Sequence, residues 1–267
     1  MNKIDEFLKK GQIPKLSKEE MLDFQIEMAN EQEGNMHLVD NIMCDKCKNR
    51  GYITFKKYVK LYNSFVEAIK DCECMRRRKI IRNAINSGLG DYIKKTFNDY
   101  VATEDWQKSY KELAVDFLKS EKEWFMMTGQ SGSGKTLLCS IIANNLLRQN
   151  KVVQYITWTD FISRLKRDVM VDQQKVSDYL NELKTVEVLF IDELLKKYNE
   201  TDLKYIIEII NFRYAKNLKT IITSERELKN LLGIDEATFS RVVERAGKYL
   251  INIPKDIKKN QRLKHIL

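Results

Sequence analysis

The sequence predicts an α/β fold in which a parallel sheet is flanked by helices and preceded by a small N-terminal region with two cysteine pairs. Three observations predict this fold. A glycine-rich loop joins an apolar run to a helix-like stretch, and apolar runs then alternate with stretches of helical periodicity. One of these runs, residues 186–191, is almost continuously apolar, as expected for a strand that is buried on both faces.

Length and charge limit the classes of function. The 267 residues suit one large or two modest domains, and 47 Lys and Arg against 38 Asp and Glu give a net charge of +9. This excess favours a polyanionic partner such as nucleic acid, although solubilising surface charge explains it equally well. No apolar run approaches the ~18 residues of a membrane span, and the N-terminus has no apolar signal region, so a cytoplasmic protein is expected.

Residues 1–40 are expected to form a helical segment that contacts a partner or packs on the rest of the chain. Helix-like stretches cover Lys3–Lys10 and Ser17–Asn30, and Gly11 and Pro14 separate them. Ser17 followed by Glu20 fits a capping box at the start of the second helix. The segment is too small to form a core of its own.

Residues 41–75 carry four cysteines in two pairs, Cys44 with Cys47 and Cys72 with Cys74, separated by 24 residues. The pairs flank a β-like stretch at 51–55, which suggests a zinc-ribbon-like module whose four thiolates bind a structural Zn²⁺. His37 is an alternative ligand. Rings and lysines within the module suit stacking on nucleic-acid bases, or they form the small core of a ribbon hairpin with the lysines in water.

A basic linker helix is expected over residues 76–90, because a run of four cations, residues 76–79, leads into a helical pattern that ends at Ser87-Gly88.

Residues 91–267 are expected to form one α/β domain. Helices are expected at 105–120, 136–148, from Thr159 or Asp160 to about 170, around 176–183 and 203–214, and at 236–246; strands are expected at 124–127, 152–156, 186–191, 220–223 and 249–253. Cys139, in the second of these helices, is expected to pack in the core.

The glycine-rich loop fits the pattern G-x-x-x-x-G-K-[ST], between a strand and a helix. Glycines let successive backbone N–H groups and the helix N-terminus converge on phosphate oxygens. Lys135 is expected to reach the β- and γ-phosphates of ATP, and the Thr136 hydroxyl to bind Mg²⁺. The predicted nucleotide-binding residues are Gly129, Gln130, Ser131, Gly132, Ser133, Gly134, Lys135 and Thr136.

Two acids, Asp192 and Glu193, end the buried strand downstream of this loop. One carboxylate is expected to hold Mg²⁺ and its neighbour to orient the attacking water. Capping of the next helix is the alternative. Ser224, at the tip of the 220–223 strand, either contacts the γ-phosphate or caps a helix together with Glu227.

The ordered set of 129–136, 190–193, 220–224 and Ser240-Arg241 resembles the AAA+ ATPases. More narrowly, it looks like bacterial and phage replicative helicase loaders of the DnaC/DnaI type and the related IstB ATPase of transposons. The narrower resemblance rests on residues 221–224, on a compact end without a separate helical lid, and on the cysteine pairs with 72–76 just before the ATPase region.

The resemblance implies roles for individual residues. Lys135 and Thr136 match the Walker A lysine and hydroxyl, Asp192 and Glu193 match the Walker B pair, and Ser224 matches the end of the sensor-1 strand, where Glu225 replaces the usual Asn. Arg241 resembles the arginine finger that completes a neighbour's site, with Arg245 as its substitute. Further arginines considered for such a role are Arg213, Arg226 and Arg262.

The function implied is that of an ATPase that loads a hexameric replicative DNA helicase onto single-stranded DNA. It would self-associate through its ATP interfaces, and the N-terminal segment would contact the helicase. An IstB-like ATPase that regulates a transposase is the alternative. A small-molecule kinase is a further alternative, against which Asp192-Glu193 argues because this pair suits the activation of water. A zinc adaptor that binds nucleotide without hydrolysis is another, and the absence of ATP turnover in the unmodified protein would favour it.

Overall fold

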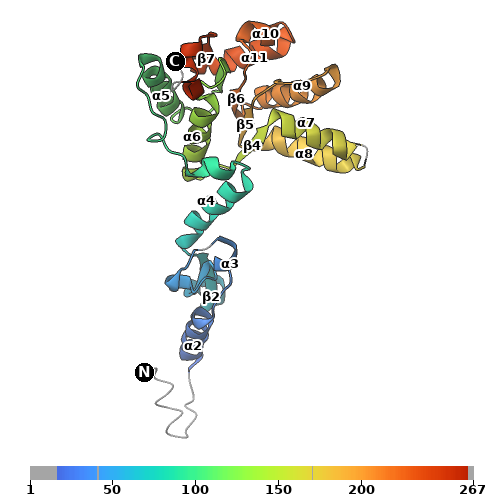
Figure 1. Cartoon of the computed structure of the whole chain (residues 1–267). Coiled ribbons are helices and arrows are strands. Elements are labelled where there is room, and N and C mark those ends of the chain that lie inside the picture. The colour runs from blue at the N-terminus through green and yellow to red at the C-terminus, as the bar shows by residue number, and fades with distance from the viewer. Residues whose placement is uncertain (1–16, 41, 170, 264–267) are drawn as a thin grey trace. The chain divides into compact units, whose positions relative to one another are not determined.

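The computed structural model describes residues 17–40, 42–169 and 171–263 (Figure 1). The chain divides into two compact units, residues 1–81 and residues 82–267. The helix expected over Lys3–Lys10 lies outside the described residues. No helix in the described ranges is both long enough and apolar enough to cross a membrane.

The first unit combines a helix, a hairpin and a cysteine-bearing loop. Helix α2 (Lys18–Glu31) begins with the predicted capping box, in which the Ser17 hydroxyl accepts from the Glu20 amide. Strands β1 (Tyr52–Val59) and β2 (Ser64–Asp71) pair antiparallel. The helix lies on the hairpin, where Lys56 Nζ is 2.8 Å from Glu19 Oε1. Among the described residues, the unit also contains α3 (His37–Asp40), η1 (Asp45–Cys47), η2 (Lys60–Tyr62) and the start of α4 (Cys74–Asn86).

The second unit contains a five-stranded parallel sheet in the order β4-β5-β6-β3-β7. This confirms the predicted fold class. All the predicted strands form, with shifts of one to two residues at most ends. Their bounds are β3 (Phe125–Gly129), β4 (Val153–Thr157), β5 (Val188–Asp192), β6 (Lys219–Thr223) and β7 (Leu250–Ile253).

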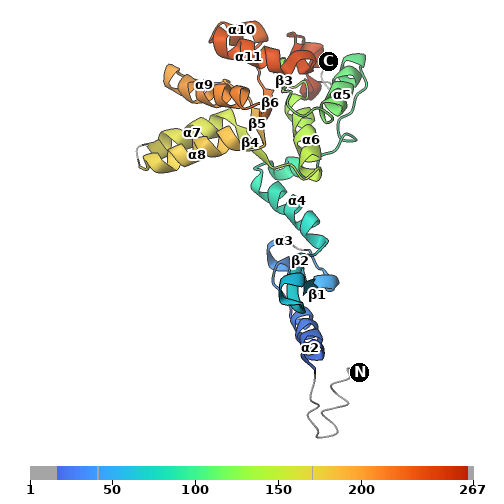
Figure 2. The same ribbon diagram turned by 180° about the vertical axis from the view of Figure 1, so that it is seen from behind.

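Helices cover both faces of this sheet (Figures 1 and 2). Strand β5 shows why, because its residues alternate between two buried clusters: Val188 and Phe190 join one, and Leu189 and Ile191 join the other. A strand buried on both faces needs no polar side. On one face lie α5 (Asp105–Phe117) and α6 (Lys135–Arg148), and on the other α7 (Trp158–Val169), α8 (Gln173–Thr185), α9 (Glu200–Ala215), α10 (Leu228–Leu232) and α11 (Glu236–Ala246).

Two capping expectations are wrong. Helix α7 begins at Trp158, before Thr159 and Asp160, and the Thr157 hydroxyl accepts from the Asp160 amide at 3.4 Å. Helix α10 has Glu227 as its N-cap residue. Ser224 therefore does not cap it.

Arg213 is fully buried and connects α8 with β6. Its guanidinium donates to the carbonyl oxygens of Leu183 at 3.0 Å, Val186 at 2.8 Å and Lys219 at 2.6 Å, and to the Thr220 hydroxyl at 3.0 Å. Burial lowers the pKa of this guanidinium to about 9. Arg213 is therefore unavailable for a neighbour's site, which removes it from the arginine-finger candidates.

Replacing Arg213 with Ala is expected to lower the free energy of unfolding by about 3 kcal/mol or more, because several buried carbonyl oxygens lose their donors together. Urea denaturation followed by circular dichroism measures the loss. The control is Arg167→Ala, whose side chain is 72% exposed in the wild type. Equal midpoints for the two variants would contradict a stabilising role for Arg213.

Candidate functional site

The glycine-rich loop lies between β3 and α6 and has the backbone that its sequence requires. Gly129, Gly132 and Gly134 have φ values of 91°, 73° and 88°. A Cβ on Gly129 would lie 2.0 Å from the Ile253 carbonyl oxygen, and one on Gly132 would lie 2.0 Å from Asn260 Oδ1. Only glycine combines this conformation with this close packing. The loop is thus shaped to present backbone amides and the N-terminus of α6 to an anion.

Lys135 is the first residue of α6, and its side chain is folded over the loop. Its Nζ donates to the carbonyl oxygens of Gly129 at 2.9 Å and Gln130 at 2.6 Å. Burial lowers the pKa of the Lys135 ammonium, and the nearby Glu225 and Asp192 carboxylates oppose that shift. The amine is therefore held where phosphate oxygens would meet the loop.

Asp192, at the end of β5, accepts hydrogen bonds from three separate elements. Its Oδ1 accepts from the Thr136 hydroxyl at 2.9 Å and from the Thr223 hydroxyl, and its Oδ2 accepts from the Tyr155 hydroxyl at 3.1 Å. Burial raises the pKa of Asp192, and these three donors oppose the shift. A carboxylate beside a hydroxyl supplies the hard oxygen ligands that Mg²⁺ prefers. The residues present therefore fit this ion.

Glu193 follows Asp192 and lines the adjoining pocket. Its backbone amide donates to the Thr223 hydroxyl at 2.9 Å, and its Oε1 lies 2.8 Å from Lys196 Nζ. Thr223 thus contacts both predicted acids, through Asp192 Oδ1 and through the Glu193 amide. Thr223 is not among the site residues predicted from the sequence, although its place at the end of β6 could have suggested a role.

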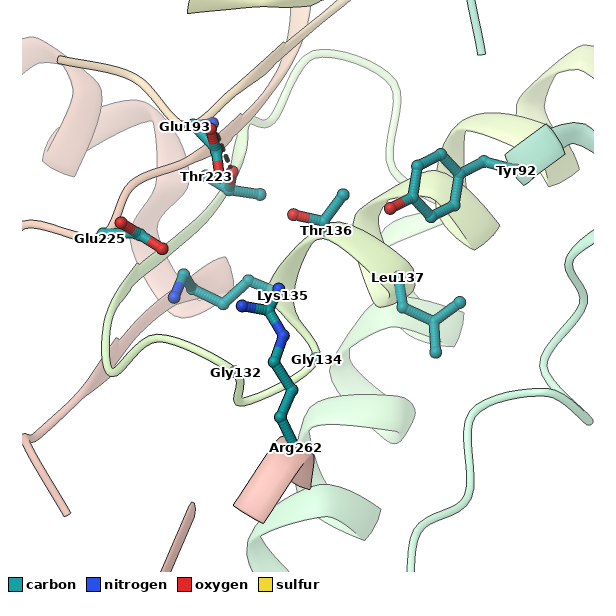
Figure 3. A pocket seen from close by; sticks show the side chains of 10 residues that line it. All are labelled: Tyr92, Gly132, Gly134, Lys135, Thr136, Leu137, Glu193, Thr223, Glu225 and Arg262. Atoms are coloured by element: carbon teal, nitrogen blue, oxygen red, sulfur yellow. Dashed lines mark hydrogen bonds between the residues drawn. The ribbon is translucent and has the colours of Figure 1, made fainter. Parts of the chain in front are cut away.

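A pocket of about 210 Å³ joins these groups (Figure 3). The predicted residues Gly132, Gly134, Lys135, Thr136 and Glu193 line it together. Its other lining residues, none of which the sequence analysis placed in this pocket, are Tyr92, Leu137, Thr223, Glu225 and Arg262.

The C-terminal segment lies against the loop. The Asp256 amide donates to Gln130 Oε1 at 2.9 Å, and the Gln261 amide donates to the Gly132 carbonyl oxygen at 2.9 Å. Two short turns, η5 (Ile257–Lys259) and η6 (Gln261–Leu263), carry the chain past the pocket, which Arg262 lines. This arginine belongs to the pocket of its own chain.

Ser224 is buried between two residues that line the pocket, Thr223 and Glu225, but is not among the described lining residues itself. Its hydroxyl donates to the Leu194 carbonyl oxygen at 2.8 Å and accepts from the Arg226 amide at 3.2 Å. Ser224 therefore supports the turn after β5. Its contact with a γ-phosphate stays a prediction.

The remaining candidate arginines, Arg226, Arg241 and Arg245, are not among the described residues that line the pocket. Arg241, on α11, donates to Asn211 Oδ1 at 2.6 Å, and Arg245 donates to the Tyr214 carbonyl oxygen at 3.1 Å. Arg226 Nε donates to the Leu195 carbonyl oxygen at 2.6 Å. The trans-acting role of Arg241, with Arg245 as substitute, stays a prediction.

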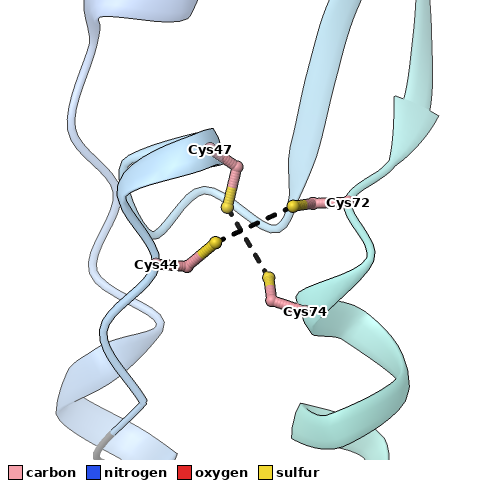
Figure 4. A group of neighbouring side chains, drawn as sticks. All are labelled: Cys44, Cys47, Cys72 and Cys74. Carbon is pink, nitrogen blue, oxygen red and sulfur yellow. Dashed lines mark hydrogen bonds between the residues drawn. The ribbon is translucent and has the colours of Figure 1, made fainter.

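The four N-terminal cysteines form a cluster (Figure 4), with all Sγ atoms within 4.8 Å of one another. Cys44 and Cys72 Sγ lie 3.8 Å apart, and Cys47 and Cys74 Sγ lie 3.6 Å apart. Four sulfurs bound tetrahedrally at ~2.3 Å from a metal lie about 3.8 Å from one another, so the donor set fits Zn²⁺. Within residues 17–40, 42–169 and 171–263, this group contains the four cysteines and not His37.

A backbone amide and an arginine of α4 donate hydrogen bonds to the cysteine sulfurs of this cluster. The Gly51 amide donates to Cys47 Sγ at 3.3 Å, and Arg78 Nε donates to Cys74 Sγ at 3.4 Å. Burial raises the pKa of Cys47, but the Gly51 amide and the neighbouring thiols outweigh it and lower this pKa to about 7. Arg78 is fully buried and pairs with Asp40 at 2.5 Å. Such outer contacts orient metal ligands.

A model of the family of IstB-like ATP-binding proteins matches residues 53–241. The chain belongs to this family. It has the P-loop ATPase fold of the family, and the predicted resemblance to AAA+ helicase loaders of the DnaC type, related to IstB, is confirmed.

Individual relatives come from several bacteria. YqaM of Bacillus subtilis, an uncharacterized protein, is 32% identical over 73% of this chain and 66% of its own length, just under two thirds. The phage-like element PBSX protein XkdC of Bacillus subtilis is 29% identical over 79% of this chain and 82% of its own length. The replicative helicase loader DnaC of Buchnera aphidicola subsp. Baizongia pistaciae is 30% identical over 60% of this chain and 66% of its own length.

Solved structures share the fold. The crystal structure of DnaI has a TM-score of 0.51 at 22% identity and covers 61% of this chain and 91% of its own. The DnaC helicase loader has a TM-score of 0.53 at 21% identity, with coverage of 61% and 99%. DnaA from Aquifex aeolicus, bound to AMPPCP, has a TM-score of 0.52 at 21% identity, with coverage of 65% and 53%.

Proposed function

We propose that this protein is an ATP-dependent loader of the replicative DNA helicase onto single-stranded DNA during the initiation of replication. The observation that carries the proposal is the convergence of Lys135, Thr136, Asp192 and Glu193 in a chain whose relatives include proteins named replicative helicase loaders. Residues 1–40 would contact the helicase together with the hairpin of the zinc module, which spans residues 41–75. Residues 76–90 would link this part to residues 91–267, which would bind and hydrolyse ATP in the cytoplasm.

In this proposal ATP occupies the pocket with its phosphates on the loop formed by residues 129–134. Lys135 leaves the loop carbonyl oxygens and binds the β- and γ-phosphates, while Thr136 and Asp192 hold Mg²⁺, which would neutralise developing phosphate charge. Glu193 orients a water molecule and accepts its proton as the oxygen bonds to the γ-phosphorus. The bond from that phosphorus to the β–γ bridging oxygen breaks, and ADP leaves.

Arg241 would complete the site of a neighbouring copy, with Arg245 as its substitute. Hydrolysis would then require self-association along single-stranded DNA, because a cation supplied in trans stabilises the transition-state charge. Loss of the γ-phosphate would loosen the contact between neighbours and set the time of helicase release. The net charge of +9 supports a DNA partner.

The first unit is the proposed helicase-contacting part because large apolar side chains are exposed on it. Leu61 and Tyr62, at the tip of the β1–β2 hairpin, are 83% and 67% exposed, and Met28 on α2 is 53% exposed. Exposed apolar side chains that lie next to one another, as Leu61 and Tyr62 do at this tip, mark protein interaction sites. Zinc would hold this unit in shape without taking part in hydrolysis, since four thiolates leave no open coordination position.

Leu61→Asp is expected to weaken the complex with the host's replicative helicase about tenfold or more, because a charge would enter an apolar contact. The full-length protein is mixed with the helicase in the presence of ATP, ADP or no nucleotide, and complex formation is followed by size-exclusion chromatography and titration. Val171→Asp is the matched control, since Val171 is also 83% exposed but lies in the second unit.

Absence of a complex under every nucleotide condition would contradict the loader proposal. The second candidate is then an ATPase that regulates a transposase, which is supported by the IstB-like model that matches residues 53–241. The same chromatography with the cognate transposase tests it. Equal weakening by Leu61→Asp and Val171→Asp would contradict the assignment of the hairpin tip.

A further inference from the structure

The turn that follows the two acidic residues has an unusual backbone. Glu193 and Leu195 have φ values of 54° and 57°, which are uncommon for residues other than glycine, asparagine and aspartate. Leu194 and Leu195 are fully buried. Backbone of this kind persists where the surrounding structure holds it in place.

The last residue of β6 and the residues after it hold this turn. The Leu194 amide donates to the Thr223 carbonyl oxygen at 2.8 Å, and the Ser224 hydroxyl donates to the Leu194 carbonyl oxygen at 2.8 Å. Arg226 Nε donates to the Leu195 carbonyl oxygen at 2.6 Å. The backbone that carries the next residue, Lys196, is thus fixed relative to the pocket.

Lys196 lies between two carboxylates. Its Nζ is 2.8 Å from Glu193 Oε1 and 3.6 Å from Glu225 Oε2. The other oxygen of Glu225, Oε1, accepts from the Ser131 hydroxyl at 2.8 Å. A continuous chain of contacts therefore runs from Ser131 in the phosphate-binding loop, through Glu225 and Lys196, to Glu193.

We propose that Lys196 is a positioning residue for ATP hydrolysis, which holds the Glu193 carboxylate toward the pocket, and that Glu225 in turn orients Lys196. The proposal rests on the proposed function, in which Glu193 orients the attacking water. It also gives a role to Glu225, which lines the pocket.

Charge explains why such a cation is needed. Asp192, Glu193 and Glu225 surround one end of the site, and Lys135 is held by loop carbonyl oxygens. Burial raises the pKa of Glu225, but the Ser131 hydroxyl and the Lys196 and Lys135 ammonium groups outweigh it, so this pKa is lowered. An anionic Glu225 repels Glu193 unless a cation lies between them. Without Lys196, the Glu193 side chain is expected to rotate away from the attacking water.

An ordinary surface ion pair is the competing explanation. The Lys196 and Glu193 side chains are 38% and 31% exposed, and pairs with this exposure contribute little to folding stability. A thermal melt therefore does not distinguish the two explanations. Separate measurements of kcat and of the ATP dissociation constant do distinguish them, because a positioning residue changes turnover and not ATP binding.

The experiment compares the full-length wild type with Lys196→Met, Lys196→Arg and Glu225→Gln. Phosphate release gives kcat, and a fluorescent ATP analogue with Mg²⁺ gives the dissociation constant. Lys196→Met is expected to lower kcat about tenfold or more, because small misplacements of a catalytic group have large effects, with the dissociation constant unchanged within about threefold. Lys196→Arg is expected to restore most of the rate, and Glu225→Gln to show an intermediate loss.

The matched control is Lys197→Met, which removes an exposed neighbouring lysine and is expected to keep the wild-type rate. A kcat in Lys196→Met equal to that of the wild type would overturn the proposal. An increase in kcat would also overturn it, because the ion pair of Lys196 with Glu193 would then restrain Glu193 and not position it. A parallel loss of ATP binding would also overturn it. If the wild type itself does not hydrolyse ATP, the proposed function fails instead, which keeps the two failures distinguishable.

Discussion

Glu193→Gln is expected to lower kcat for ATP hydrolysis by about 100-fold or more, because the amide cannot accept the proton of the attacking water. ATP binding is expected to be retained, since the loop, Lys135 and Thr136 are unchanged and Gln has nearly the same shape as Glu. Phosphate release at saturating ATP measures the first effect, and titration with a fluorescent ATP analogue measures the second.

Glu112→Gln is the control for this variant, because Glu112 is an exposed glutamate on α5. It is expected to hydrolyse ATP at the wild-type rate. If Glu193→Gln hydrolysed ATP as fast as the wild type, Glu193 would not be the residue that orients water. If the wild type showed no turnover alone, with single-stranded DNA or with the helicase, the hydrolysis proposal itself would be contradicted.

Cys47→Ser is expected to reduce the bound zinc from about one ion per chain to a small fraction of that, because a serine hydroxyl is a much poorer zinc ligand than a thiolate. The first unit is expected to unfold at a lower temperature, since metal binding stabilises the folded state. Elemental analysis of the purified protein measures the metal content, and differential scanning calorimetry measures the transition.

Cys139→Ala provides the comparison. Cys139 is buried in α6, in the other unit, so this variant is expected to keep its zinc although its own packing changes. ATP binding by Cys47→Ser is expected to persist, because every described residue that lines the proposed nucleotide pocket belongs to the second unit. Wild-type protein purified without any bound metal would contradict the zinc assignment.

Much of the fold could be predicted because its signals are local. The glycine spacing of the loop, the apolar run before Asp192 and the helical periodicity of residues 236–246 each reflect neighbouring residues, and the structure has β3, β5 and α11 at those places. The cysteine cluster could be predicted because few other arrangements explain two close pairs in one short segment. Element ends were less predictable, as at Thr157, which ends β4 and also caps α7, so that no loop separates the two elements.

The missed part of the site depends on tertiary contacts. Tyr155 and Thr223 come from two strands that flank β5 in the sheet, and nothing in their own segments shows that both contact Asp192. Lys196 and Glu225 are 29 positions apart, 225 − 196, and meet only because β5 and β6 are adjacent. A single sequence identifies the strands but not which charged side chains meet at their ends.

The path of the C-terminal segment across the phosphate-binding loop has a practical consequence for handling the protein. Asp256 and Gln261 are bonded to the loop, and Arg262 lines the pocket. A substitution or a label introduced within residues 256–262 would lie beside the pocket and is expected to perturb the ATP titrations described above. Labels for those titrations therefore belong at described residues outside this segment, such as the exposed Glu112 on α5.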